Sequence, residues 1–411
     1  MNDLTNIIPP MKNRDELISE LAVFPNYDEK IRLESQAVRL TALSDLYDLY
    51  IPSQMSLEIY NKLYLALLRS LHKKNTRMAI QQQYENRKAV IGQKYNGIIG
   101  GSDSFTIIGS SGIGKSTAIS RAISLITENR IVELKNPYTK VVLCIVVQCP
   151  FDCSVKGLLL EVLRKVDEEL GSKYYQNALR ARATTDMLIG SVSQVALNHI
   201  GILIVDEIQN VVSNKNGKSL IGALTQLINN SGVSIGMVGT PECTTFFESA
   251  MQLARRSVGL QYGAMSYDAY FKNFCKVLFD YQFVAYKSEL TDAVIEWLYE
   301  HSAGVTSIVV SLIHDGQEMA ILNGKETLDL DILNAAYKQR LSLVHGYIEP
   351  SIQKRKSTSD IKPKNKVVSK VRMVEVDNKI SITSLAQKSK NEGIDIVPLL
   401  KKYFQIAEVA I

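Results

Sequence analysis

Residues 109–116, GSSGIGKS, constrain the fold more than any other stretch of this sequence. They match the phosphate-binding pattern G-x-x-x-x-G-K-[ST], in which glycines let successive backbone N–H groups turn inward towards phosphate oxygens. Such a loop needs a strand before it and a helix after it. SFTIIG (104–109) has the composition of a short buried strand, and STAISRAISLI (116–126) has apolar residues at helical spacing. The sequence therefore predicts a strand, a phosphate loop and a helix in succession.

The side chains of this loop divide by role. Lys115 is placed to reach the β- and γ-phosphates of a nucleotide, and the Ser116 hydroxyl is placed to help hold Mg²⁺. The helix that starts here adds the positive end of its dipole. The expected cofactors are therefore ATP and Mg²⁺. The predicted nucleotide-binding residues are Gly109, Ser110, Ser111, Gly112, Ile113, Gly114, Lys115, Ser116 and Thr117.

A second motif supplies the acidic groups of such a site. GILIVDEIQN (201–210) is an apolar run that ends in adjacent carboxylates. We expect this strand to lie beside the phosphate loop, where Asp206 organises Mg²⁺ and Glu207 polarises the water that attacks the γ-phosphate. The next strand, VSIGMVGT (233–240), ends in Thr240, a polar residue expected to sense the intact γ-phosphate. A strand end with two solvated acids is the plain alternative.

Two adjacent arginines follow in QLARRS (252–257). Two interpretations of Arg255 and Arg256 stay open. As a surface pair, they would interact with the dipole at the end of a helix. As an arginine finger, one of them would reach the ATP of a neighbouring subunit, because a guanidinium stabilises the charge of the transferred phosphoryl group.

The pattern of the whole chain predicts a mostly parallel α/β sheet within several domains. The 411 residues suffice for two or three domains, and no apolar run approaches the length of a membrane span. We predict an N-terminal helical region (1–90), a nucleotide-binding core (91–275), a helical lid (276–347), and a basic linker with a C-terminal interaction segment (348–411). The start lacks a secretory signal pattern, so a cytoplasmic protein without membrane partners is expected. Neither the five cysteines nor the five histidines have metal-ligand spacing.

Charge is distributed unevenly along the chain. Between Lys354 and Arg372 there are eight Lys or Arg and one acid, whereas the whole chain carries only +5. Nucleic-acid binding by the folded part must therefore use local patches rather than bulk charge. In the N-terminal region, residues 53–74 have an apolar stripe at helical spacing. Packing against the next domain and docking of a partner both remain open for this stripe.

Taken together, GSSGIGKS, ILIVDE, VGTPE and ARRS, followed by a helical lid, resemble an AAA+ ATPase. More narrowly, the chain is similar to the ATPases that select targets for heteromeric cut-and-paste transposons, the TnsC group, which is related to the TniB and MuB regulators. This resemblance covers roughly residues 1–345. It rests on FPNYDEKIR (24–32), IPSQMSLEIYNKLYLALLRSL (51–71), CPFDCSVKG (149–157), RARATTDML (180–188) and DEIQN (206–210).

The resemblance implies ATP-dependent self-assembly into rings or helical filaments on duplex DNA. It also implies contacts with transposase subunits and with a target-selecting protein, and regulatory ATP hydrolysis that disassembles the filament. One departure stands out, because many AAA+ lids carry a sensor arginine where this chain has GVTS (304–307). Coupling of the lid to ATP is therefore expected to be weak or absent. By motif, the nucleotide site would comprise Lys115, Ser116, Asp206, Glu207 and Thr240.

For DNA, the resemblance implies that elements between the phosphate-loop helix and the Asp-Glu strand line the inside of the assembly. The candidates are Lys135, Tyr138, Lys140, Ser154 and Lys156. Such contacts to phosphates give position without reading sequence, and repetition along an assembly strengthens them. Each lysine also fits an ordinary solvated side chain. Two alternative functions stay open: another AAA+ machine that acts on DNA, such as an initiator, or a small-molecule P-loop phosphotransferase.

Overall fold

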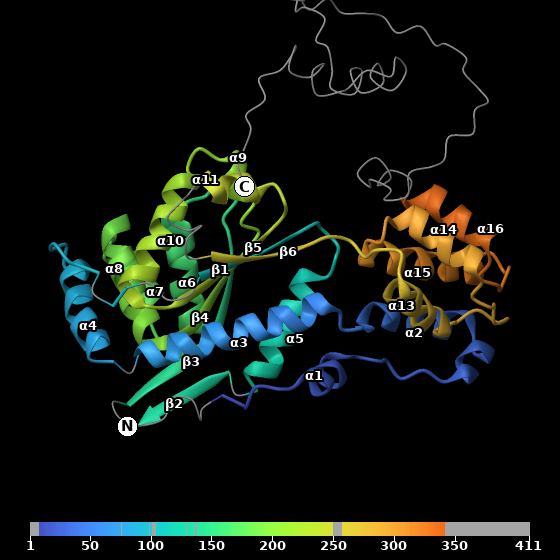
Figure 1. Ribbon diagram of the computed structural model, residues 1–411, viewed down its shortest axis with the longest axis horizontal. Helices are drawn as coiled ribbons and strands as arrows, with labels where there is room; N and C mark the ends of the chain where they lie inside the picture. The colour runs from blue at the N-terminus through green and yellow to red at the C-terminus, as the bar shows by residue number, and fades with distance from the viewer. Residues whose placement is uncertain are drawn as a thin grey trace, which may run out of the picture. The chain divides into compact units, whose positions relative to one another are not determined.

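The computed structural model describes residues 8–74, 76–97, 99–100, 104–128, 130–135, 138–249 and 257–341. The chain divides into two compact units, Met1–Gln353 and Lys354–Ile411, and every described residue belongs to the first. Within the described ranges, no helix is both long and apolar enough to cross a membrane. Figure 1 labels the helices and strands.

The described residues include a six-stranded sheet with the strand order β2-β3-β4-β5-β1-β6. Neighbouring strands are parallel except for β2 and β3, which form an antiparallel pair at one edge. The mostly parallel sheet is thus confirmed. In this order β5 lies between β1, which precedes the phosphate loop, and the Asp-Glu strand β4. The strands are β1 (Ser104–Gly109), β2 (Ile131–Lys135), β3 (Tyr138–Gln148), β4 (Ile200–Asp206), β5 (Ser234–Gly239) and β6 (Ser257–Tyr262).

Helices cover both faces of this sheet (Figure 1). Alternate residues of β4 point to opposite faces, so Ile202 and Ile204 join one apolar cluster while Leu203 and Val205 join the other. The first cluster contains α1 (Arg14–Leu21), α3 (Gln54–Lys74) and α5 (Lys115–Ile126). The second contains α6 (Val155–Leu170), α8 (Thr185–His199) and α10 (Gly217–Ser231). Shorter helices are α7 (Tyr174–Arg180), α9 (Asn210–Ser213) and α11 (Cys243–Ser249), and α4 (Arg77–Val90) packs against α8.

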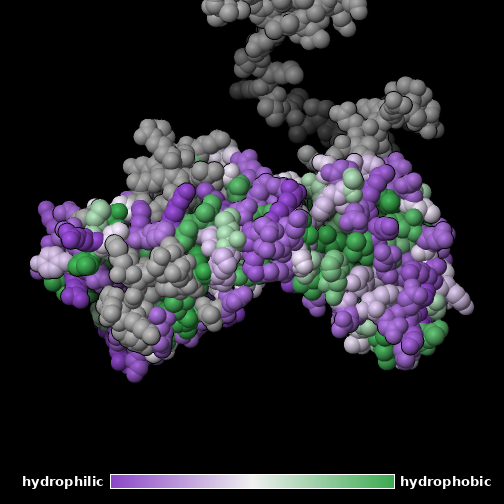
Figure 2. Space-filling view, turned by 60° about the horizontal axis from the view of Figure 1, so that its bottom comes forward, coloured by the Kyte–Doolittle hydropathy of each residue, from purple (hydrophilic) through white to green (hydrophobic). Residues whose placement is uncertain are grey.

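The apolar stripe of α3 packs against the sheet. Tyr60 and Leu67 are buried within the same cluster as Ile107 of β1. Packing, rather than docking of a partner, therefore accounts for the stripe. On the face seen in Figure 2, hydrophilic residues cover much of the coloured surface and hydrophobic residues lie among them in smaller groups.

A separate apolar cluster lies within the predicted helical lid. It combines α13 (Ala269–Asp280), α14 (Asp292–Ser302), α15 (Thr306–Leu322) and α16 (Leu330–Ala336), followed by the helical turn η4 (Tyr337–Leu341). The expected boundary after residue 275 falls inside α13, whose Phe271, Cys275 and Leu278 belong to this cluster. The segment with η2 (Glu29–Leu33), α2 (Gln36–Leu43) and η3 (Ser44–Asp48) also packs here.

A partly buried ion pair connects that N-terminal segment to the lid. The Arg39 guanidinium donates to both carboxylate oxygens of Glu326, at 2.6 and 2.8 Å, and to the Phe283 carbonyl. The hydrogen bond from Arg39 holds the pKa of the Glu326 carboxyl below its usual range. The predicted N-terminal helical region is therefore shared, since α1 and α3 pack on the sheet and α2 packs on the lid.

Candidate nucleotide-binding site

The phosphate loop connects β1 to α5, as the motif predicts. Gly112 has a φ of 80°, in the left-handed region that favours glycine. At Gly109 the constraint is space, because a Cβ there would lie 2.6 Å from Ile113 Cδ1 and 2.9 Å from the Tyr262 carbonyl oxygen. These two glycines therefore allow a turn tight enough to present backbone N–H groups to a phosphate.

Lys115 lies inside the loop that it is predicted to serve. Its Nζ donates to the carbonyl oxygens of Gly109, at 2.5 Å, and Ser110, at 2.8 Å. Burial lowers the pKa of the Lys115 ammonium, while the nearby carboxylates of Asp206 and Glu207 act in the opposite direction. The loop thus holds the ammonium group close to where phosphate oxygens would lie.

The two groups predicted to hold Mg²⁺ come together. Ser116, in α5, donates through its Oγ to Asp206 Oδ2 at 3.4 Å, although β5 separates β4 from the strand β1 that precedes the loop. A hydroxyl and a carboxylate are oxygen ligands of the kind Mg²⁺ prefers. Asp206 Oδ1 accepts a hydrogen bond from the Glu207 backbone N–H at 2.8 Å, and Glu207 has a φ of 57°. Glu207 thus adopts the left-handed backbone region that residues other than glycine rarely occupy.

These elements surround one cavity of about 290 Å³. It unites loop, acid and strand-end residues that are far apart in sequence. Gly109, Ser110 and Ile113 do not line the cavity, and Ile113 is instead buried beneath the loop. Sequence reasoning missed Gln209, Gly239 and Ser307 as wall residues. The lining residues are Ser111, Gly112, Gly114, Lys115, Ser116, Thr117, Asp206, Glu207, Gln209, Gly239, Thr240 and Ser307.

Gln209 contacts the carboxylate expected to act as the base. Its Nε2 donates to Glu207 Oε2, while its Oε1 is buried with no hydrogen-bond partner among the described residues. The end of β5 is close, since a Cβ on Gly239 would lie 3.2 Å from that Oε1. Thr240 also lines the cavity, and its hydroxyl donates to Glu242. The signal for Gln209 was its position two residues after Glu207 within DEIQN.

The lid contacts the phosphate loop through GVTS (304–307), the segment that contains no arginine. The Ser307 backbone N–H, in the first turn of α15, donates to the Gly112 carbonyl oxygen at 3.0 Å. Nearby, the Met265 N–H, from the segment between β6 and α13, donates to the Gly304 carbonyl oxygen at 2.9 Å. The lid therefore meets the loop through its backbone rather than through a guanidinium.

The remaining predicted residues lie elsewhere. Arg255 and Arg256 fall outside the described residues. Lys135 and Tyr138 pair at the ends of β2 and β3. Lys140 Nζ lies 3.2 Å from Glu133 Oε1 across the same hairpin. Ser154 caps α6 by accepting from the Gly157 N–H, and the Lys156 side chain beside it is exposed. None of these DNA candidates lines the nucleotide cavity.

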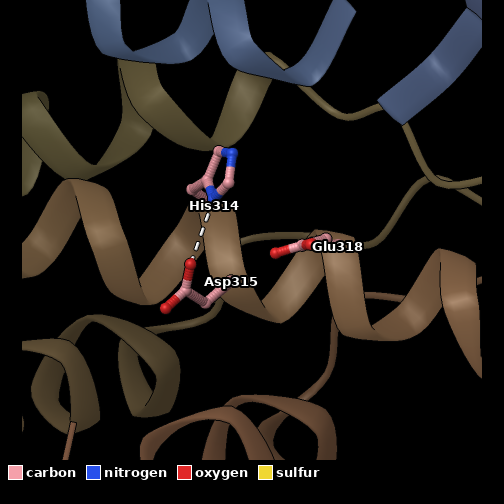
Figure 3. Close-up of side chains that lie close together, drawn as sticks. All are labelled: His314, Asp315 and Glu318. Carbon is pink, nitrogen blue, oxygen red and sulfur yellow. Dashed lines mark hydrogen bonds and ion pairs between the residues drawn. The ribbon is translucent and has the colours of Figure 1, made fainter. Parts of the chain in front are cut away.

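One further polar cluster occurs on α15, away from this cavity. Figure 3 shows His314, Asp315 and Glu318, with a hydrogen bond of 3.0 Å between His314 Nδ1 and Asp315 Oδ1. The Arg340 guanidinium pairs with both carboxylates, at 3.2 Å from Asp315 Oδ1 and also with Glu318. Because one guanidinium already pairs with both carboxylates, we assign the cluster to ion pairing within the lid.

Comparison with known families identifies the core. Residues 99–247 match the family model of the AAA domain. Together with the mainly parallel sheet flanked by helices and the phosphate loop, this match shows the predicted AAA+ P-loop ATPase core. AAA domains in general bind and hydrolyse nucleotides. A search of curated protein sequences found no match.

Solved structures give distant similarities. ORC1 of Aeropyrum pernix in complex with DNA aligns with a TM-score of 0.41 and 15% identity over 64% of each chain, so this chain spans less than two thirds of that protein. Drosophila ORC bound to DNA gives 0.42 and 12% over 97% of this chain and 83% of that chain. The RuvB Holliday junction branch migration motor of Thermotoga maritima gives 0.33 and 14% over 64% and 67%. With TM-scores below 0.5, these similarities are too distant to indicate a function.

Proposed function

We propose that this chain is an ATP-dependent, DNA-binding regulator of transposition. It oligomerises on duplex DNA, links a target-selecting protein to transposase subunits, and hydrolyses ATP to disassemble. The cavity that unites the phosphate loop with Asp206, Glu207 and Thr240 carries the ATPase part of the proposal. The transposition part rests on the sequence resemblance to the TnsC group, and the four predicted regions of the chain remain part of the same proposal.

The side chains of the cavity suit phosphoryl transfer to water. Lys115 would exchange its two loop carbonyls for phosphate oxygens, which requires only a short movement of a flexible ammonium group. Ser116 and Asp206 would hold Mg²⁺, which neutralises charge on the phosphates when it is bound. Glu207 would accept a proton from the attacking water, and Thr240 would orient that water or the γ-phosphate.

Assembly would complete the site. The described residues that line the cavity include no arginine. In the proposal, Arg255 or Arg256 of one subunit therefore supplies the guanidinium for the ATP of its neighbour. The DNA contacts would come from the β2–β3 hairpin and the start of α6, with Lys135, Tyr138 and Lys140 on the first and Ser154 and Lys156 on the second.

Co-sedimentation with duplex DNA tests this proposal. We expect large assemblies with ATP or a non-hydrolysable analogue, and none with ADP. Lys115→Ala should abolish assembly by removing nucleotide binding, and Arg255→Ala/Arg256→Ala should abolish it while nucleotide still binds. Lys30→Ala, a change at an exposed lysine of the N-terminal segment, serves as the matched control and should assemble normally.

Other outcomes would redirect the assignment. Nucleotide binding without DNA-dependent assembly would contradict the transposition role and favour a phosphotransferase. Assembly on DNA that neither recruits nor stimulates a transposase would favour another AAA+ machine acting on DNA, such as an initiator.

A further inference from the structure

The outer face of α4 has the spacing of a coiled-coil seam. Five residues on this face follow one another at alternating steps of three and four positions: Arg77, Ile80, Tyr84, Arg87 and Ile91. Ile91 lies just after the end of the helix. All five are exposed, with Ile80 at 69%, Tyr84 at 65% and Ile91 at 67%. Residues at this spacing lie on one side of a helix and pack against a second helix along their length. No described element covers this face.

The opposite face of α4 is fixed to the core. Gln82 and Asn86 are fully buried, and Asn86 Nδ2 donates to the Asn230 carbonyl at 3.0 Å. Ala89 approaches α8 so closely that a Cβ on Gly190 would lie 2.6 Å from its Cβ. Figure 1 shows α4 beside α8 at one end of the core. The seam is therefore presented by a helix that its own packing already holds in place.

Charge defines what can cover the seam. Arg77 and Arg87 form no ion pair with any described carboxylate, and the one acid of α4, Glu85, is buried and paired with Lys88. A second copy of the same face would bring arginine opposite arginine in a parallel pair, which is repulsive, and arginine opposite isoleucine in an antiparallel pair, so neither orientation pairs the charges. Duplex DNA would pair with the arginines but would leave Ile80 and Ile91 without apolar contacts. A helix with apolar residues and carboxylates at matching positions satisfies both groups.

We propose that the outer face of α4 is a docking surface for an acidic amphipathic helix of a partner protein. Apolar side chains of that helix would cover Ile80, Tyr84 and Ile91, and its carboxylates would pair with Arg77 and Arg87. The surface lies apart from the nucleotide cavity and does not depend on the function proposed above.

Two designed peptides test this surface. Each is a labelled, three-heptad helix with leucine facing the apolar positions; one carries glutamate opposite the arginines and the other carries lysine. We expect the full-length protein to bind the glutamate peptide at least about tenfold more tightly, measured by fluorescence anisotropy. Arg77→Glu/Arg87→Glu should reverse this preference, and Ile80→Ala/Tyr84→Ala should weaken binding of the glutamate peptide about tenfold. The control Lys30→Glu/Lys276→Glu makes the same charge change at exposed lysines elsewhere and should keep the wild-type preference.

Several results would overturn the proposal. Equal affinity for the two peptides, binding of neither, or an unchanged preference in Arg77→Glu/Arg87→Glu would each do so. A variant that altered self-association or duplex DNA affinity without altering peptide binding would assign the face to a second copy or to DNA instead. Circular dichroism and ATP binding of the variants check folding. Peptide binding is measured without ATP hydrolysis or DNA assembly. Failure of the proposed function would therefore leave the peptide result interpretable, and failure of the peptide test would leave the proposed function untouched.

Discussion

Two lysines in this molecule bind backbone carbonyls in very different surroundings. Lys115, at the start of α5, donates to two carbonyls of the phosphate loop and borders a cavity that also contains carboxylates. Lys74, at the end of α3, donates to the carbonyls of Ala196 and Leu197 near the end of α8. Burial lowers the pKa of Lys74 to about 7, and no carboxylate acts against it.

The different surroundings suggest different roles: Lys115 can exchange its hydrogen-bond partners for a ligand, whereas Lys74 stabilises the fold. Lys115 can leave its carbonyls for phosphate oxygens because space and other charged groups adjoin it. Lys74 satisfies carbonyls at a helix C-terminus, and among the described residues it has no other hydrogen-bond partner. The same hydrogen-bonding pattern therefore indicates function in one place and stability in the other.

The largest expected difference between the two lysines is in ATP hydrolysis after each is replaced by methionine. Lys115→Met should lower ATP hydrolysis by about 10²–10³-fold, because one preorganised donor to the transition state is lost. Lys74→Met should leave hydrolysis by the folded protein close to that of the wild type. Phosphate release under conditions where both variants are folded measures the contrast. Equal losses in the two variants would break the comparison.

The pH dependence of stability tests the buried environment of Lys74. Its pKa is about 7 when folded and 10.5 in the unfolded reference, so between these values the unfolded chain binds the extra proton. Stability from this group therefore rises with pH across that window and is constant below it. From pH 7 to pH 9, wild type should gain roughly 2 kcal/mol in unfolding free energy relative to Lys74→Met. Urea unfolding at both pH values measures this gain, and a constant difference would mean that the ammonium is not desolvated.

Contact between the lid and the phosphate loop is testable with a matched pair of glycines. Gly112 has a φ of 80° and a Cβ there would lie 2.3 Å from Ser307 Oγ, whereas Gly92 has a φ of 75° and no neighbour within 4 Å. Each glycine-to-alanine change should cost about 1–2 kcal/mol of backbone strain.

Only Gly112→Ala should also weaken ATP binding, by about tenfold, because it displaces Ser307 and distorts the loop. Titration with a fluorescent ATP analogue compares the two variants. Equal ATP affinity would show that the lid contact does not contribute to the site, in agreement with the weak lid coupling expected from GVTS.

Local patterns predicted the central elements well. The strand over 104–109 has the predicted bounds, and β4 and β5 lie within a residue or so of theirs, because each is a short, mostly apolar stretch that becomes buried. The phosphate loop and the Asp-Glu pair were found for the same reason. Local sequence did not reveal that β5 inserts between β1 and β4, since strand order depends on how crossovers pack.

Contacts between distant segments were missed for a related reason. The apolar pattern of residues 1–90 indicates that helix faces are buried, but it does not tell which partner buries them, and α2 packs on the lid while α3 packs on the sheet. Ser307 reaches the phosphate loop only because the lid folds back on it. The periodicity of apolar residues indicates which face of a helix is buried, but the tertiary fold decides which element buries it.

The smallest expected effect concerns Gln209. We interpret it, like Lys115, as a side chain that exchanges its hydrogen-bond partners when the site is in use. Its amide donates to Glu207 while its own oxygen is buried without a partner, an arrangement that leaves the side chain ready to rearrange. Gln209→Ala should lower kcat for ATP hydrolysis about three- to tenfold with KM nearly unchanged, because the base loses its orientation while ATP contacts remain. Gln209→Glu should move the acidic limb of the kcat profile to higher pH, since a second carboxylate beside Glu207 raises the pKa of the pair. Gln93→Ala, at an exposed glutamine, should change neither quantity. An unchanged kcat in Gln209→Ala would mean that the amide only fills space at the end of β5, and that the exchangeable contacts of this cavity are limited to Lys115.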